Sequence, residues 1–438
     1  MKNRRSGEEL DLKLKGVAPE KNRKPIKRRN SGNIPPHRNV DQEGEGQNSR
    51  EVKEMRKVIA ILGVLLLFAL AGSAFAADVI KIGHTVSLTG GASMWGQSEA
   101  RALDMLVKKI NAAGGVLGKQ IEFVRYDNRN DAVEAVNVAR RLVSDGVIAV
   151  IGPAQSGNSI ASAPVLEKAK IPMVVTTATN PYVTIDQKTD KVRPFAFRPC
   201  FIDPFQGTVA ARFAITDLGA KKGAILYDVG SDYGQWLAKY FEEAFIAKGG
   251  TIVAKEAFRT DELDYRAQLG KIKDLAPDVI FIPTSQKEAA MAAKQARDLG
   301  IKAILLGTDN WGSPDLIELG GSAIDGGYFV NLTDLADPDI QDFVAEYKAE
   351  FGEDPVLPNP VMAQDALIMI VEALKKAGTT DGEKLADALA NLKDIKVTSG
   401  PLTIDPANHN PLDKPAVIQQ VDVTNKTFKF VKKFVSTE

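Results

Sequence analysis

The sequence predicts an α/β protein with two lobes, each built on a doubly wound parallel sheet. The first observation is a series of short apolar runs with β-branched character, which is typical of strands buried on both faces of a parallel sheet. These runs are Val79–Ile82, Ile121–Val124, Val147–Ile151, Met173–Val175, Ala224–Leu226, Val279–Ile282 and Ile304–Leu306. The second observation is helical periodicity between the runs. Strands that alternate with helices over this length favour doubly wound sheets.

Apolar residues spaced i, i+3, i+4, i+7 predict the helices. This spacing occurs over residues 103–110, 237–244, 340–347 and 367–374. The first of these helices is followed by Gly114-Gly115 and the second by Gly249-Gly250. Glycine just past the last turn is a common helix stop.

The order of the segments predicts a chain that passes back and forth between the two lobes. A stretch with Pro181, Pro194, Pro199 and Pro204 separates the first strand series from the second, and short strands are expected after Gly400. We therefore expect lobe 1 to comprise residues 77–200 and 330–398, and lobe 2 residues 201–329 and 399–438.

Residues 1–54 differ in composition from the rest of the chain. They carry 14 Lys or Arg, 9 Asp or Glu and almost no large apolar residues. Such a segment cannot bury enough surface to offset its ordering entropy. We interpret it as a disordered basic extension, either an over-extended start of the reading frame or a dispensable leader. The alternative is a basic arm that binds nucleic acid, which conflicts with the export signal that follows.

Residues 55–76 have the three parts of a cleaved signal peptide, with Met55 as the expected true start. Basic residues 56–57 precede an apolar run at 58–70, and the small-x-small site Ala74-Phe75-Ala76 follows. The run is shorter than the about 20 residues of a membrane span. Residues 70–73 resemble a lipoprotein box with serine in place of the lipidated cysteine. We therefore expect a periplasmic protein that is not lipid-anchored.

Composition excludes several classes of protein. Cleavage after Ala76 leaves 40 Lys or Arg and 47 Asp or Glu, a net charge of −7, which argues against nucleic-acid binding. The single Cys200 excludes an intrachain disulfide, and three separated histidines form no Cys/His metal cluster. No Gly-x-Ser-x-Gly elbow or Walker motif is present. We expect His84 in the core or at the lip of a strand and His409 in a solvated turn, so no enzyme, metal or cofactor is predicted.

Polar and aromatic residues collect in the loops that follow the predicted strands, where open α/β sheets bind ligands. The candidate ligand-binding residues are Trp95, Ser156, Thr177, Thr179, Tyr233 and Asp309, with Ala178, Ser285 and Trp311 as further candidates. Hydroxyls and helix-opening amides in the first lobe favour an anion, and Asp309 can neutralise a cation. Together they suit the carboxylate and ammonium of an α-amino acid, with Trp95, Tyr233 and Trp311 walling its side chain.

Each candidate also has a structural alternative. Ser156 and Thr179 can cap helices. Tyr233 can pack in a turn, and Asp309 can be a solvated turn residue. The two tryptophans, Trp95 and Trp311, can belong to the core.

At these residues the sequence resembles the leucine/isoleucine/valine-type periplasmic binding proteins of ABC transporters, over essentially all of residues 77–438. The resemblance is carried by Ile80–Gly90, Ile110–Lys119, Ile151-Gly152-Pro153, Thr179-Asn180-Pro181, Asp232-Tyr233-Gly234 and Gly400-Pro401-Leu402. It implies the type I periplasmic binding fold, with two lobes joined by a three-segment hinge. It also implies that Ser156, Thr177 and Thr179 hold the ligand carboxylate, that Tyr233 and Asp309 meet the ammonium from the other lobe, and that Trp95 lies at the pocket lip. Thr284-Ser285 stands where an aromatic residue is often found.

The resemblance implies the solute-binding subunit of an ABC importer. It would capture an amino acid, branched-chain or related, by hinge closure and deliver it to the permease subunits as a monomer. Alternatives are a binding protein of the same family for an amide, urea or aromatic acid, a ligand-sensing regulator of the same fold, and a hydrolase or transferase on two α/β lobes.

Overall fold

The computed structural model describes residues 54–57, 59 and 79–435 of the 438-residue chain. Apart from Glu54–Lys57 and Ile59, which are helical, the predicted basic extension and signal peptide lie outside the described residues. Both remain predictions.

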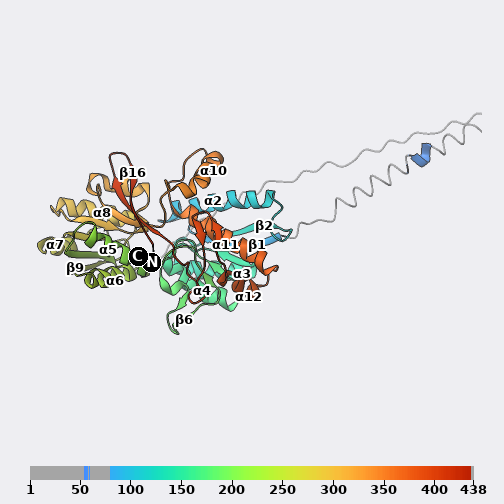
Figure 1. The fold of residues 1–438 in the computed structure, drawn as a ribbon, viewed down its shortest axis with the longest axis horizontal. Helices are drawn as coiled ribbons and strands as arrows, with labels where there is room; N and C mark the ends of the chain where they lie inside the picture. The colour runs from blue at the N-terminus through green and yellow to red at the C-terminus, as the bar shows by residue number, and fades with distance from the viewer. Residues whose placement is uncertain (1–53, 58, 60–78, 436–438) are drawn as a thin grey trace, which may run out of the picture. The chain divides into compact units, whose positions relative to one another are not determined.

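The first sheet has five strands in the order β2-β1-β3-β4-β7, and all of its pairs are parallel. The strands are β1 (Val79–Val86), β2 (Gln120–Asp127), β3 (Ala149–Ile151), β4 (Met173–Val174) and β7 (Ala196–Phe197). The helices that follow its strands or pack against it are α2 (Ser93–Ala112), α3 (Ala132–Ser144), α4 (Ser156–Lys168), α11 (Asn359–Ala377) and α12 (Gly382–Ala390) (Figure 1). Helices on both faces bury strands on both sides, as the continuous apolar runs predict.

The second sheet has seven strands in the order β16-β15-β12-β11-β10-β8-β9. Its strands are β8 (Lys222–Asp228), β9 (Thr251–Phe258), β10 (Val279–Phe281), β11 (Ile304–Gly307), β12 (Tyr328–Asn331), β15 (Ala416–Asp422) and β16 (Thr427–Phe434). Its helices are α5 (Asp203–Thr216), α6 (Asp232–Ala247), α7 (Arg266–Asp274), α8 (Gln286–Asp298) and α9 (Pro314–Gly320), and α10 (Gln341–Phe351) follows β12. The α/β class and its doubly wound sheets are confirmed. The second sheet is mixed, however, because β15 and β16 form an antiparallel hairpin on its edge.

Two small hairpins and four short helices complete the described elements. They are β5 (Ile185–Asp186) with β6 (Lys191–Val192), β13 (Ile395–Val397) with β14 (Gly400–Leu402), and the 3₁₀ helices η1 (Pro181–Val183), η2 (Asp309–Trp311), η3 (Gly321–Ala323) and η4 (Pro338–Ile340).

Local sequence explains where several elements begin and end. Helix α2 is followed by Gly115 with φ +76°, where an added Cβ would lie 2.0 Å from the carbonyl oxygen of Lys119. Only glycine fits that left-handed, crowded position. At the start of α6, Ser231 accepts a 3.2 Å hydrogen bond from the Gly234 amide, the usual role of an N-cap serine.

The chain passes between the two sheets after β7, after β12 and after β14. A buried network holds the last of these passages. Asp365 of α11 accepts hydrogen bonds from the Ser399 amide at 3.1 Å and from the Ser399 hydroxyl, and it forms a 3.3 Å ion pair with Lys414.

Leu402 and Ile404 are buried in the core cluster of the first sheet, because β14 pairs with β13 before the chain leaves. The lobe bounds expected from the sequence stay a prediction. One expectation needs correction. His409 is only 6% exposed, stacks on Phe197 with a ring separation of 4.3 Å and places Nδ1 3.1 Å from the Ala196 carbonyl oxygen. It is a packed core residue and not the solvated turn residue that its Asn-rich surroundings suggested.

Within residues 79–435 and the few described residues before them, no helix combines the length and apolarity needed to cross a membrane.

Candidate functional site

Loops that follow strands of both sheets meet in space. An added Cβ on Gly157, at the start of α4, would lie 3.5 Å from Asp232 Oδ2, at the start of α6. Nearby, the Tyr182 and Trp236 rings pack edge to face with centroids 5.0 Å apart. Two helix N-termini from different sheets therefore face each other at the carboxyl ends of the strands, where ligands bind in this class of fold.

The first-sheet side of the site offers hydroxyls and an open helix start. Ser156 is the first residue of α4, which begins after Gln155 without a side-chain cap. The Ser156 hydroxyl accepts a 3.3 Å hydrogen bond from the Asn180 amide, and the Thr177 hydroxyl donates to the Ala154 carbonyl at 3.3 Å. Neither hydroxyl caps a helix, so the first amides of α4 stay available to an anion.

A buried arginine supports the backbone on the first-sheet side of the site. The Arg198 guanidinium is 0% exposed and donates to the carbonyl oxygens of Ala178 and Asn180, both at 2.7 Å. These two contacts fix the turn that carries Ala178 and Thr179. Sequence reasoning missed Arg198, which has no motif of its own.

The second-sheet side centres on Asp309, the first residue of η2. Its Oδ1 accepts hydrogen bonds from the Tyr233 hydroxyl at 2.5 Å and from Gln206 Nε2 at 2.7 Å. Burial raises the pKa of Asp309, while these two donors act in the opposite direction. Tyr233 and Asp309 were both predicted site residues, and the structure brings them into direct contact.

Asp203 lies between the two sides and was not predicted. It begins α5 directly after the first passage between the sheets, and its amide donates to the Thr179 carbonyl at 2.9 Å. Asp203 is fully buried, and burial, reinforced by the charge of Asp309, raises its pKa to about 7 although Thr179 and Arg198 oppose the shift. The only sequence signal was an aspartate before Pro204 at a helix start, which ordinarily indicates a simple cap.

Several buried polar atoms of this cluster have no hydrogen-bond partner among the described residues. They are the oxygens Thr179 Oγ1, both carboxylate oxygens of Asp203, Gln206 Oε1 and Thr308 Oγ1, and the nitrogens Asn180 Nδ2 and Arg198 Nε. Buried polar groups are nearly always paired. A concentration of unpaired polar atoms is therefore the signature of a polar ligand site, and this one presents acceptors as well as donors.

The remaining candidates lie in different settings. Trp95 is half-buried in the first turn of α2. Ser285 precedes α8 without a side-chain cap bond. Trp311 is 0% exposed and packs in the core cluster beneath the second sheet, against Gly307. A role of its indole in the side-chain wall stays a prediction.

A second buried network supports the Trp95 turn. Glu99 Oε1 accepts hydrogen bonds from Thr176 at 2.8 Å and from Asn359 at 3.2 Å. The same Asn359 amide donates to the Trp95 carbonyl at 2.8 Å. Glu99 thus ties α2 both to the loop before Thr177 and to the first residue of α11.

The residues described contain no group of three or more His, Cys, Asp or Glu side chains that could hold a metal ion. What the site can do chemically is bind: it offers an anion-binding helix start on one side and two buried carboxyl groups on the other.

Two α/β sheets whose strand-end loops meet at a cluster of buried polar groups are the arrangement expected of a solute-binding protein. Residues 79–427 match the family model described as periplasmic binding protein, and the chain belongs to this family.

Named relatives agree with this membership. The leucine-, isoleucine-, valine-, threonine- and alanine-binding protein of Pseudomonas aeruginosa is 28% identical over 346 residues, which cover 77% of this chain and 89% of the relative. The crystal structure of a leucine-binding protein from Thermotoga maritima superposes with a TM-score of 0.76 at 33% identity, covering 82% of this chain and 99% of that one.

Two further structures were solved with ligands. A branched-chain amino acid substrate-binding protein of Streptococcus pneumoniae in complex with isoleucine gives a TM-score of 0.73 at 30% identity, with 82% and 99% coverage. A solute-binding protein of R. palustris in complex with 4-hydroxybenzoate gives 0.72 at 25% identity, with 82% and 97% coverage.

Proposed function

We propose that this protein captures an α-amino acid with a free ammonium and a free carboxylate, and delivers it to an ABC importer. The observation that carries the proposal is the cluster of unpaired buried acceptors around Asp203 and Asp309 opposite the uncapped start of α4. A zwitterion satisfies both sides at once, because an ammonium pairs with the carboxyl groups and a carboxylate pairs with the helix amides.

The site residues have distinct proposed roles. Ser156, Thr177 and Thr179 hold the ligand carboxylate together with the α4 amides. Tyr233 and Asp309 meet the ammonium, with Asp203 as an additional acceptor. Ala178 supplies a backbone contact, Trp95 covers the lip, and Ser285 borders the side-chain region. We propose that the ligand's side chain is apolar, in keeping with the branched-chain ligands in the names of the relatives.

The mechanism is capture by closure. Groups from both sheets contribute to the site, so a ligand that bridges them binds the closed form more tightly than the open form and shifts the population towards it. The closed form then docks on the permease subunits. We further propose residues 77–200 and 330–404 as one moving lobe, residues 201–329 and 405–438 as the other, export by a signal peptide at residues 55–76, and a monomeric protein in the periplasm.

The competing ligand class is an aromatic acid, which the R. palustris structure favours by its bound 4-hydroxybenzoate. Such a ligand would satisfy the α4 amides but would bring no cation to Asp203 and Asp309. Two buried carboxyl groups without a cation are costly. The geometry therefore supports an amino acid better than an aromatic acid.

Isothermal titration calorimetry of the purified protein tests the proposal. The titrants are the twenty amino acids, 4-hydroxybenzoate, benzoate, urea and acetamide. We expect saturable binding of at least one amino acid with an apolar side chain. Binding of an aromatic acid or an amide, with none of the amino acids, would overturn the proposed ligand class.

A further inference from the structure

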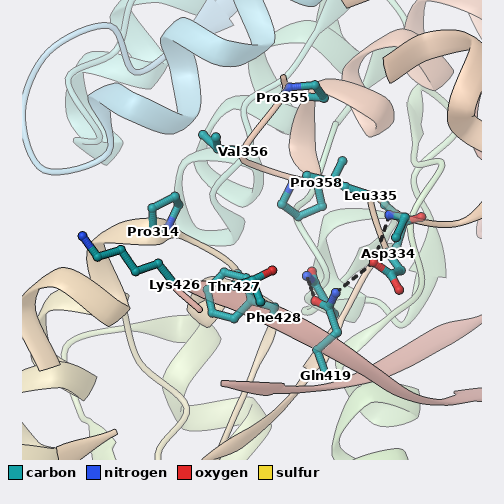
Figure 2. A pocket seen from close by; sticks show the side chains of 14 residues that line it. Pro314, Asp334, Leu335, Pro355, Val356, Pro358, Gln419, Lys426, Thr427 and Phe428 are labelled. Atoms are coloured by element: carbon teal, nitrogen blue, oxygen red, sulfur yellow. Dashed lines mark hydrogen bonds between the residues drawn. The ribbon is translucent and has the colours of Figure 1, made fainter. Parts of the chain in front are cut away.

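A second pocket is lined by none of the residues proposed for the amino-acid site. It has a volume of about 290 Å³, close to the lower end of the range seen for small-molecule sites. Figure 2 shows its walls, which come from the turn at the start of α9, from β12 and the segment after it, from the loop before α11 and from the β15–β16 hairpin. We name it the crossover pocket, defined by Pro314, Asp334, Val356, Pro358, Lys426 and Phe428.

One end of the crossover pocket carries a buried carboxylate. Asp334 is 7% exposed, and its Oδ1 accepts hydrogen bonds from Gln419 Nε2 at 3.2 Å and from the Ala336 amide at 3.1 Å. No hydrogen bond reaches Asp334 Oδ2 from any residue that the structure describes. A largely buried carboxylate with one free oxygen is a site for a cation.

The floor beside Asp334 has its polar groups paired internally. Asn331 Nδ2 donates to Gln419 Oε1 at 2.7 Å, and Asn331 Oδ1 accepts from the Leu332 amide at 2.8 Å. These two hydrogen bonds fix the orientation of the Gln419 side-chain amide. That amide in turn donates a hydrogen bond to Asp334. A carboxylate positioned in this way is preorganised for a ligand.

The opposite end of the pocket carries a positive charge. Lys426 lies at the hairpin tip, exposed, and Figure 2 places it across the pocket from Asp334. It forms no ion pair with the described residues. Between the two charges lie the apolar side chains of Pro314, Pro358, Phe428 and Val356, the last of which is 53% exposed.

We propose that the crossover pocket binds a small ω-amino acid, a zwitterion whose ammonium and carboxylate are separated by a short apolar chain. The ammonium pairs with Asp334, the carboxylate with Lys426, and the methylene chain lies on the prolines and Phe428. This charge separation distinguishes the occupant from an α-amino acid, in which both charges sit on one carbon.

The pocket adjoins the amino-acid site through one turn. Gly312 lines the crossover pocket and follows Asp309 by three residues, and the amide side chain of Asn331 packs against it, 2.8 Å from where a Cβ would be. The next residue, Ser313, contacts the Met94 sulfur at 3.7 Å, immediately before Trp95. The new site is thus distinct from the proposed one but shares a wall with it.

Methyl NMR of the purified full chain tests the proposal, with Val356 as the reporter in the pocket wall. The probes are 5-aminopentanoate and 6-aminohexanoate, and each is compared with pentylamine, which lacks the carboxylate, and pentanoate, which lacks the ammonium. All titrations are repeated on Asp309→Ala, in which the proposed amino-acid site is disabled. If the proposed amino-acid site turns out to be wrong, the titrations of the crossover pocket can therefore still be interpreted.

We expect the Val356 methyl signals to shift saturably with an ω-amino acid in both backgrounds. Pentylamine should bind more weakly and pentanoate not detectably. Asp334→Asn, which keeps the shape and the amide contacts, should weaken binding by about tenfold or more, and Lys426→Gln by about two- to fivefold because the lysine is exposed. Lys393→Gln, on the exposed surface outside the pocket, is the matched control and should change nothing.

Three outcomes would overturn the assignment. The first is that the Val356 methyl signals do not shift at a probe concentration of about 10 mM, which is about ten times the dissociation constant of a millimolar site. The second is equal binding by wild type and Asp334→Asn. The third is a shift that disappears in Asp309→Ala, which would place the probe in the amino-acid site.

Discussion

Glu99 Oε2 lies 4.0 Å from His84 Nε2, both side chains are 0% exposed, and neither atom has a hydrogen-bond partner among the described residues. Arg125 occupies the other ring nitrogen of His84, donating from Nε to Nδ1 at 2.9 Å, and its own charge is met by Asp104 at 2.6 Å. Burial, followed by the Arg125 charge, lowers the pKa of His84 well below its usual value. The histidine is therefore neutral, and Glu99 has no cation beside it.

The first prediction concerns pH and stability. Burial raises the pKa of Glu99 from 4.5 to about 7. Between these values the folded state binds more protons than the unfolded state, so stability falls as pH rises from 4.5 towards 7 and then levels off. The expected contribution is about 3 kcal/mol. Urea unfolding at pH 5 and pH 8 measures it.

Glu99→Gln is the matched variant, because the amide keeps the oxygen that accepts from Thr176 and Asn359. In the variant, the free energy of unfolding should lose the pH dependence that Glu99 contributes. It should keep the pH dependence that Asp203 contributes in the same direction. Identical pH dependence in wild type and variant would show that Glu99 titrates normally.

The second prediction is proton release on ligand binding. Asp203, with its pKa of about 7, is partly protonated at neutral pH. An ammonium beside it favours the ionised form, so binding should expel protons, and affinity should rise as pH increases from 6 to 8. Calorimetry in phosphate and in Tris measures the released protons. Asp203→Asn should abolish the release and Glu99→Gln should leave it intact, whereas proton uptake by wild type would contradict the proposed contact.

The third prediction separates ammonium recognition from general binding. Asp309→Ala removes the acceptor that Tyr233 and Gln206 hold in place. Loss of a buried charge partner costs about 2–5 kcal/mol, so leucine or the best amino-acid ligand should bind at least about 30-fold more weakly. The deaminated analogue 4-methylpentanoate should lose far less. Equal losses for both ligands would remove the counter-ion role, and Asp298→Ala on the exposed end of α8 serves as the control.

The fourth prediction concerns Arg198 as a positioning residue. Lysine keeps the charge but cannot reach both carbonyl oxygens with a planar fork. Arg198→Lys should therefore cost about 2 kcal/mol of unfolding free energy and should also weaken ligand binding by about tenfold, because the Ala178–Thr179 turn loses its support. Arg212→Lys on α5, where the guanidinium packs on Phe434, should leave affinity unchanged. An Arg198→Lys protein with reduced stability and full affinity would limit the arginine to a structural role.

Strong local patterns in the sequence were enough to predict many of the elements. The apolar runs identified β1 to β4, β8, β10 and β11, because a strand buried on both faces needs continuous apolar residues. The parallel strands β7, β9 and β12 were not predicted. Periodicity and glycine stops located α2, α6, α10 and α11, and the strand-end loops yielded Ser156, Thr179, Tyr233 and Asp309. The resemblance to binding proteins rested on those same loops.

Which of these residues meet, and which additional ones join them, depends on how the chain folds in three dimensions. Asp203, Gln206 and Arg198 lie in or near the first passage between the sheets and gain their roles solely from partners distant in sequence, such as Asp309 for Gln206. For Trp311 and His409 the local sequence predicted loop residues, but both side chains are buried. Trp311 packs against Gly307, and His409 packs against Phe197. Periodicity reports what one segment buries, but a site made by two sheets depends on how their ends are brought together, and no single segment encodes that.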